Sequence, residues 1–92
     1  MAIEVRIPTI LRTYTGGAKT VEGSGGTLDE LLSNLDAAHD GLRGRLVDGE
    51  KLRRFVNVYL NDEDVRVLEG LDTTVGETDT LVILPAMAGG LR

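Results

Sequence analysis

The sequence predicts an α+β fold in which one main amphipathic helix lies across one face of a mixed four- to five-stranded sheet. Three observations predict it. Apolar residues alternate with charged ones at 3–7, leucines with helical spacing follow at 28–35, and apolar strands come at 55–60 and 81–84. Two strands, a helix and then further strands form an α+β order. At 92 residues, the chain is long enough for one domain with its own core.

The first two strands are predicted to form an antiparallel pair. The segment from Ile3 to Ile7 alternates with a period of two, so one face of that strand is buried and the other is wet. Pro8 ends the strand because it has no N–H to donate. A loop and a Gly-Gly turn at 16–17 then lead to a more polar strand at 19–22.

The main helix is predicted to start at Thr27. Thr27 lies three residues before Glu30, which is the spacing of a capping box with bonds in both directions. The helix should end near Asp40, with Gly41 as its C-cap. Four leucines share one helical face and should pack on the sheet: Leu28, Leu31, Leu32 and Leu35.

The segment at 55–60 is the clearest strand between the helix and the end of the chain. Its even-numbered residues are apolar and should face the core, whereas Phe55, Asn57 and Tyr59 should face the other way. Arg6 lies on the same wet face in this scheme. We expect Arg6, Phe55 and Tyr59 to form a docking patch for a partner protein, with scattered surface residues as the equally weighted alternative.

The connections around this strand are less regular. Residues 42–53 predict an irregular segment with one turn around Leu46, and 61–64 predict a turn. A short edge strand is expected at 65–67, and a single 3₁₀ turn at 71–75.

The last strand, 81–84, is strongly apolar, and Pro85 should stop its pairing. The first and last strands are the most apolar, so they should lie side by side at the centre of the sheet. This is the order of the ubiquitin-like β-grasp. We therefore expect a β-grasp domain over 1–85 and a flexible C-terminal tail over 86–92.

Composition excludes several classes of function. There is no cysteine, which removes disulfides, thiolate metal sites and cysteine nucleophiles. The net charge of −5 argues against nucleic acid or an anionic membrane as the main partner. No signal peptide or membrane-spanning run is present, which predicts a cytoplasmic protein.

No set of residues predicts a self-sufficient active site or a metal site. The single histidine, His39, is better explained by its favourable place at a helix C-terminus. The acidic run 62–64 lacks the spacing and the glycine of a calcium loop. Gly23–Gly26 precedes a helix, but no Lys-Ser/Thr pair follows as in a phosphate loop.

The tail is the one segment that suggests chemistry. Ala86, Met87, Ala88 and Gly89 carry small or unbranched side chains, and an extended chain from Ala86 to Gly90 would reach roughly 17 Å. Such a tail can thread a narrow channel, with Met87 as an adaptable apolar anchor. A terminal carboxylate has no catalytic power of its own, but a partner could activate it by adenylation in a dry site.

The chain resembles the ThiS/MoaD family of sulfur carriers, and within it the carriers of thiocarboxylate-dependent cysteine biosynthesis in actinobacteria. The matching stretches cover nearly the whole chain: IPTILR with TGG at 7–17, RFVNVYLNDEDVR at 54–66, and ILPAMAGG at 83–90. The last stretch is typical of the family, and the first two indicate the cysteine branch.

The resemblance implies a protein cosubstrate rather than an enzyme. An E1-like adenylating partner would use ATP to activate the carboxylate of Gly90, and sulfur would displace AMP to leave a thiocarboxylate. In the cysteine branch, a PLP-dependent cysteine synthase would supply the acceptor, and a JAMM-type zinc peptidase would release the product. No cofactor would be bound by the chain itself.

The overhang Leu91-Arg92 departs from the family pattern, because Gly90 then has no free carboxylate. Either a peptidase removes both residues, or they are not native to the chain, or this form is inactive. Three alternative functions also stay open: the small subunit of molybdopterin synthase, a ubiquitin-like protein modifier and a plain interaction module. One scaffold can host all of them.

Overall fold

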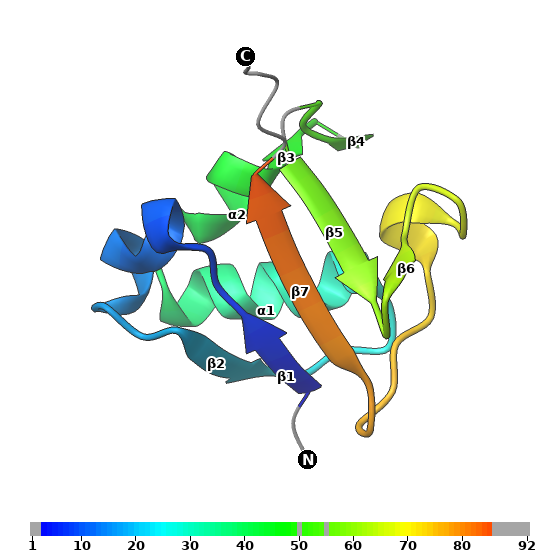
Figure 1. The fold of residues 1–92 in the computed structure, drawn as a ribbon, viewed down its shortest axis with the longest axis horizontal. Coiled ribbons are helices and arrows are strands. Elements are labelled where there is room, and N and C mark those ends of the chain that lie inside the picture. The colour runs from blue at the N-terminus through cyan, green and yellow to red at the C-terminus, as the bar shows by residue number, and fades with distance from the viewer. Residues whose placement is uncertain (1–2, 50, 55, 86–92) are drawn as a thin grey trace.

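The structure, a computed structural model, describes residues 3–49, 51–54 and 56–85. Its strands are β1 (Ile3–Arg6), β2 (Thr20–Gly23), β3 (Val47–Asp48), β4 (Lys51–Leu52), β5 (Val56–Leu60), β6 (Glu63–Asp64) and β7 (Thr80–Pro85). Its helices are α1 (Leu28–Ala38) and α2 (Leu42–Leu46), with the 3₁₀ helices η1 (Thr9–Thr15) and η2 (Gly70–Asp72). Figure 1 shows α1 crossing behind a twisted sheet. The predicted α+β fold is confirmed.

Strand β7 lies at the centre of a five-stranded mixed sheet with the order β2-β1-β7-β5-β6. It pairs in parallel with β1 and antiparallel with β5, while β1 and β2 form the predicted antiparallel pair. The first and last strands are therefore adjacent, as the sequence indicated. This arrangement confirms the predicted β-grasp, in which the last strand is inserted between the two hairpins.

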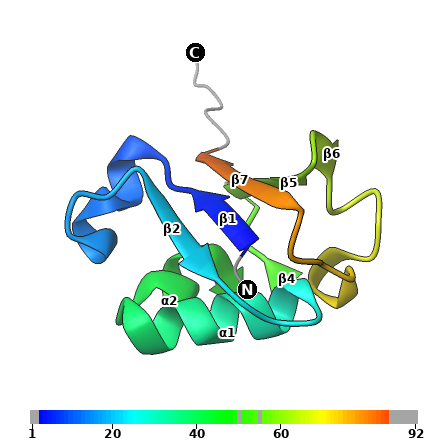
Figure 2. The ribbon, with the colours of Figure 1, turned by 90° about the horizontal axis from the view of Figure 1, so that it is seen from below.

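The core lies between the sheet and the two α-helices, which Figure 2 shows on the same side of the sheet. All four predicted leucines of α1 are at most 1% exposed. Burying each such side chain contributes about 2 kcal/mol before entropy is counted. They pack with residues of one hydrophobic cluster that includes Val5, Val58, Leu81 and Ile83 from the strands.

The N-terminus of α1 is capped largely as predicted. The Glu30 amide donates to Thr27 Oγ1 at 3.3 Å, but the carboxylate of Glu30 accepts from the Gly26 amide at 2.7 Å instead of from Thr27. The predicted C-cap is wrong: His39 ends α1, and Gly41, with φ of 91°, precedes α2. The chain turns directly into this second helix, so Gly41 is the N-cap of α2 and not the C-cap of α1.

Two further predictions are corrected near the ends of β5. The edge strand is Glu63–Asp64 and not 65–67, because Asn61 and Asp62 both have positive φ (51° and 73°) and form a tight two-residue turn. Val65 is fully buried instead. β7 spans Thr80–Pro85, one residue more at each end than the predicted strand 81–84, and Pro85 lies opposite Val56 at its last position. A proline can stand at the end of a strand because its carbonyl still accepts.

The connections hold more structure than expected. The predicted loop after Pro8 contains the 3₁₀ helix η1, whose Leu11 and Thr15 are buried. Residues 42–52 contain α2 and the small β3–β4 hairpin, where one turn was predicted. The second 3₁₀ helix starts at residue 70, one residue before the predicted segment. Within the part of the chain that the structure describes, no helix is long and apolar enough to cross a bilayer.

Candidate functional site

The candidate site begins where β7 ends. Leu81 and Ile83 of β7 point into the core and are at most 1% exposed, and the strand is paired along both edges. A strand held by two neighbours and by its own buried side chains is among the last parts of a domain to open. The segment that follows Pro85 is therefore attached to a strand that is held along both edges and by its own buried side chains.

All predicted tail residues lie outside the described residues. These are Ala86, Met87, Ala88, Gly89, the sulfur-bearing Gly90, and the overhang Leu91 and Arg92. Their roles, and the division into a domain over 1–85 and a tail over 86–92, stay predictions.

The start of β5, next to Pro85, is held by the side chain of Arg66. Its Nη2 donates to the carbonyl oxygens of Arg53 and Val56, both at 2.6 Å, and its Nη1 donates to Asn57 Oδ1 at 3.1 Å. A guanidinium is suited to this task because its donors lie in one rigid plane. Since Val56 pairs with Pro85, Arg66 helps to fix the strand that flanks the exit of the tail.

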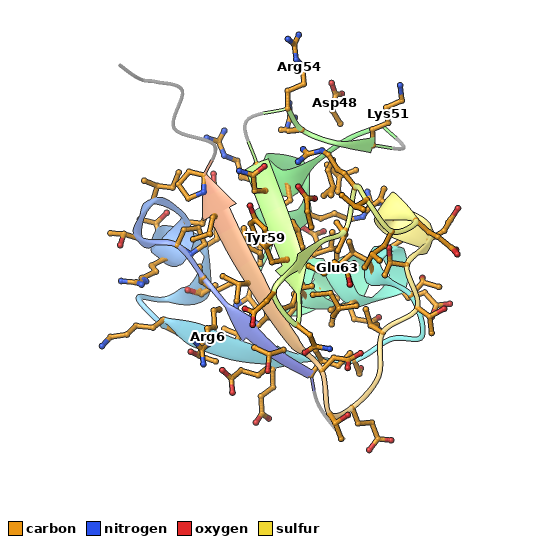
Figure 3. All side chains as sticks on the ribbon, turned by 45° about the vertical axis from the view of Figure 1, so that its right-hand side comes forward. Arg6, Asp48, Lys51, Arg54, Tyr59 and Glu63 are labelled. Carbon is orange, nitrogen blue, oxygen red and sulfur yellow. The ribbon has the colours of Figure 1, made fainter. Side chains whose placement is uncertain are left out.

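The structure brings two of the three predicted docking residues to the open face of the sheet, but not into contact. Arg6 and Tyr59 are both paired with Val82 of β7 in the strand register, from opposite sides. They are thus two strand spacings apart, about 10 Å, as Figure 3 illustrates. Phe55 lies outside the described residues.

The surroundings of Arg6 and Tyr59 are polar. The side chain of Arg6 is 62% exposed and its Nε forms an ion pair with Glu4 Oε2 at 2.9 Å. Tyr59 is half-buried and lies opposite Asp64 of β6. The open face therefore offers a charged and aromatic surface at this level of the sheet, with the half-buried Val82 of β7 between these two residues.

The most exposed apolar side chains near the tail exit were missed by the sequence analysis. Ile10 of η1 is 66% exposed and Leu84 of β7 is 44% exposed. Both line a surface groove that also contains Pro8 and Pro85. The hydrophobic pattern could not predict that these two side chains are exposed. Ile10 lies in a segment where apolar residues do not recur regularly, and Leu84 belongs to a strand that was predicted to be buried.

The acidic residues considered for metal binding belong to the β5–β6 hairpin and its turn. No group of three or more His, Asp or Glu that could hold a metal ion is found within the described ranges. Asp64 Oδ1 accepts from the amide of Arg66 at 2.9 Å, and Asp62 belongs to the tight turn before β6. The His39 amide donates to the carbonyl of Leu35 at the end of α1.

The match to a family model shows to which protein family this chain belongs. The ThiS family matches residues 5–90, which is nearly the whole chain and includes both glycines of the tail. The chain belongs to the ThiS family. The predicted resemblance to ThiS/MoaD sulfur carriers is thereby confirmed, and the single match extends over the β-grasp domain and the tail as far as Gly90.

Curated relatives and solved structures agree with this family. The chain is 52% identical to the sulfur carrier protein CysO of Mycobacterium tuberculosis over 93 aligned positions, covering 98% of this chain and all of that protein. It is 36% identical to the small archaeal modifier protein 3 of Haloferax volcanii over 64 positions, 70% of each chain. A chain in the crystal structure of the Amycolatopsis orientalis BexX/CysO complex superimposes with a TM-score of 0.92 at 56% identity, covering 97% of this chain and 100% of that one.

Proposed function

We propose that this chain is a sulfur carrier protein that donates sulfur from a thiocarboxylate at Gly90, in the biosynthesis of cysteine. The observation that supports it most is similarity to CysO proteins over essentially the full length of both chains. A domain-only similarity would support the fold alone, but the family match continues through the Gly-Gly pair.

The proposed chemistry takes place on the tail and not on the folded domain. A partner transfers AMP from ATP to the carboxylate of Gly90, with release of pyrophosphate. A sulfur nucleophile then attacks the acyl carbon, a C–S bond forms, the C–O bond to AMP breaks, and the thiocarboxylate remains. The chain is a cosubstrate in this proposal, because every activating group belongs to a partner.

The fold supplies position and reach. Strand β7 holds the base of the tail, and the residues from Ala86 to Gly89 would lie along the channel of the partner. Since an extended residue spans at most about 3.5 Å, Gly90 can enter a site roughly 17 Å from the end of β7. Small side chains keep that channel narrow enough to exclude water.

We further propose the partners that this chemistry requires. These are an E1-like adenylating and sulfur-transferring enzyme that uses ATP, a PLP-dependent cysteine synthase and a JAMM-type zinc peptidase. A similar chain has been crystallised in the BexX/CysO complex of Amycolatopsis orientalis, which supports the proposal that a carrier of this kind binds partner proteins. The dependence on ATP places the cycle in the cytoplasm.

The overhang provides the sharpest test of the role of Gly90. We expect no ATP–pyrophosphate exchange with the chain that ends at Arg92, and exchange with a chain that ends at Gly90, when each is incubated with the adenylating enzyme. Addition of sulfide should then raise the intact mass of the shorter chain by about 16 Da, as oxygen is replaced by sulfur. Equal exchange by both chains would contradict the assignment of Gly90.

A second candidate function is a ubiquitin-like modifier joined to lysine side chains of other proteins. The similarity to small archaeal modifier protein 3 favours it. The same adenylated Gly90 would then form an amide with an amine in place of a thiocarboxylate. Incubation of the activated chain with cell extract separates the two, because a modifier gives new covalent bands at higher mass and a carrier does not.

A further inference from the structure

The charges of this chain are unevenly distributed along the sequence. Residues 43–54 carry five arginines and lysines and two acidic residues, a net charge of +3. The other eighty residues carry five arginines and lysines and thirteen acidic residues, a net charge of −8. A run of charge is usually solvated surface, so its place in the fold decides whether it has a further role.

The five cations of this segment gather at the end of the sheet where β7 ends. Arg54 lies two residues before Val56, which pairs with Pro85. Arg45 of α2 lines a small hollow together with Pro85. Figure 1 shows the β3–β4 hairpin at the same end of the sheet as the arrowhead of β7. We call this surface the basic end, and it consists of five residues of α2, β4 and the link to β5: Arg43, Arg45, Lys51, Arg53 and Arg54.

Three of these cations are exposed and unpaired. Arg45, Lys51 and Arg54 form no ion pair with a carboxylate of the described residues. Asp48 lies opposite Lys51 in the hairpin, and Figure 3 shows Lys51 and Arg54 pointing away from the body of the domain. The Arg53 amide and Nε donate to carbonyl oxygens of α2 at 2.9 and 3.0 Å, which fixes the hairpin to the helix. The positive charge is therefore held in place and available to another molecule.

The opposite end of the sheet is acidic. Glu22 of β2 lies opposite Glu4 of β1, and Glu4 pairs with Thr80, the first residue of β7. The turn after β5 reaches the same end, because Asn61 Nδ2 donates to Asp79 Oδ1 at 2.9 Å. The two ends are separated by the length of β7, roughly 17 Å for six residues. Four acidic residues gather at this acidic end: Glu22, Asp62, Glu77 and Asp79.

A charge separation of this kind orients a molecule in the electric field of a partner. A partner with carboxylates around the channel for Gly90 attracts the basic end and repels the acidic end. The tail follows Pro85 at the basic end, so this orientation presents the tail first. Steering by such fields can raise association rate constants by about 10-fold to 1000-fold, and salt weakens it.

We propose that the basic end is an electrostatic steering surface, which attracts an acidic partner enzyme and turns the chain so that its C-terminal segment meets that enzyme first. The matching feature of the partner is a group of carboxylates at the mouth of the channel that receives Gly90. The basic end lies on α2 and the β3–β4 hairpin and is separate from the open face of the sheet. The inference rests on the proposed function, and it concerns the rate of encounter and not the contacts of the bound complex.

The test measures the association rate constant of the chain that ends at Gly90 with the adenylating enzyme, by stopped flow, at about 0.02 M and about 0.5 M ionic strength. Lys51→Gln combined with Arg54→Gln should lower this rate constant about fivefold at low ionic strength. At high ionic strength the loss should be less than about twofold, because salt screens the field. The dissociation rate constant should stay within about twofold of that of the unmutated chain.

Ser24→Glu combined with Thr78→Glu is the matched control. It adds two negative charges, so the net charge changes from −5 to −7, as in the first double variant. Both residues are exposed and lie at the acidic end, next to the end of β2 and the start of β7. The association rate constant of this variant should fall by less than about twofold. Equal losses in the two double variants would overturn the proposal, because net charge and not its position would then control the encounter.

The salt dependence separates this inference from the proposed function. If the unmutated chain binds but its association rate constant does not fall as ionic strength rises, the steering surface is refuted and the proposed function stands. If the unmutated chain does not bind the adenylating enzyme at all, both proposals fall. Thermal melting checks the fold of each variant. Arg45→Gln, at an exposed position of α2, should lower the association rate constant about twofold and gives an independent answer should the first double variant be unstable.

Discussion

On the face of the sheet that α1 covers, the strands place Val5, Val58 and Ile83, which are at most 1% exposed. On the open face, the same three strands place Arg6, Tyr59 and Leu84. The first set explains why the chain folds, since it forms one cluster with the leucines of α1. The second set contributes little to that cluster. Exposed side chains that the fold does not need are the better indication of contact with other molecules.

The largest expected difference between the two faces concerns stability. Leu31→Ala removes a side chain that is fully buried under the sheet and should lower the free energy of unfolding by about 2–5 kcal/mol. Leu84→Ala, at a position that is 44% exposed, should lower it by less than about 1 kcal/mol. Urea denaturation of both variants measures the contrast. Similar losses would mean that Leu84 is part of the core and is not reserved for a partner.

A smaller loss of stability is expected when the side chain of Arg66, which holds the start of β5, is removed. Arg66→Ala leaves the carbonyl oxygens of Arg53 and Val56 without this donor and should cost about 1–2 kcal/mol. Arg66→Lys should recover only part of the loss, because an ammonium group cannot reproduce the planar fork.

Hydrogen exchange locates the effect of Arg66. Faster exchange should be confined to amides near Val56 and Asn57, beside the exit of the tail. If Arg66→Lys were as stable as the unmutated chain, charge alone would account for the contribution of Arg66.

The smallest expected effect concerns the polar part of the open face. Arg6→Glu combined with Tyr59→Ala should weaken binding of the adenylating enzyme by about threefold to tenfold, measured by calorimetry on the chain that ends at Gly90. The ion pair of Arg6 with Glu4 is exposed, so its loss should change stability by less than about 1 kcal/mol.

The two changes flank Val82 of β7 from opposite sides. A loss of affinity in the Arg6/Tyr59 variant would show that the open face at this level of the sheet takes part in binding. Unchanged affinity for the Arg6/Tyr59 variant would mean that these residues are ordinary solvent-exposed surface and do not contact the partner.

The fold could be predicted from local patterns because each pattern had one plausible explanation. Alternation at Ile3–Ile7 indicated a half-buried strand, and four leucines on one face indicated a helix packed on a sheet. The cap at Thr27 was recognisable because its bond to the Glu30 amide joins residues three apart. Each of these features depends only on residues that are close together in the sequence, so it can be predicted without the tertiary structure.

The errors occurred where backbone geometry, and not side-chain character, decided the outcome. The edge strand was displaced to Glu63–Asp64 because Asn61 and Asp62 both adopt positive φ. Gly41 was assigned to the end of α1 because the short helix α2 has no strong signature of its own. The last strand was predicted one residue too short at its end, because Pro85 can take the final position with only its carbonyl available.

The sequence by itself determined the strand and helix periods, the lack of cysteine and the family to which the tail motif belongs. Only the tertiary structure decided that Arg66 fastens the strand beside Pro85, and that Ile10 and Leu84 face one groove with Arg12 and Lys19. The physical reason is distance along the chain. Residues 10 and 84 line the same groove because β1 and β7 pair in parallel at the centre of the sheet. No local pattern encodes which exposed side chains that pairing brings together.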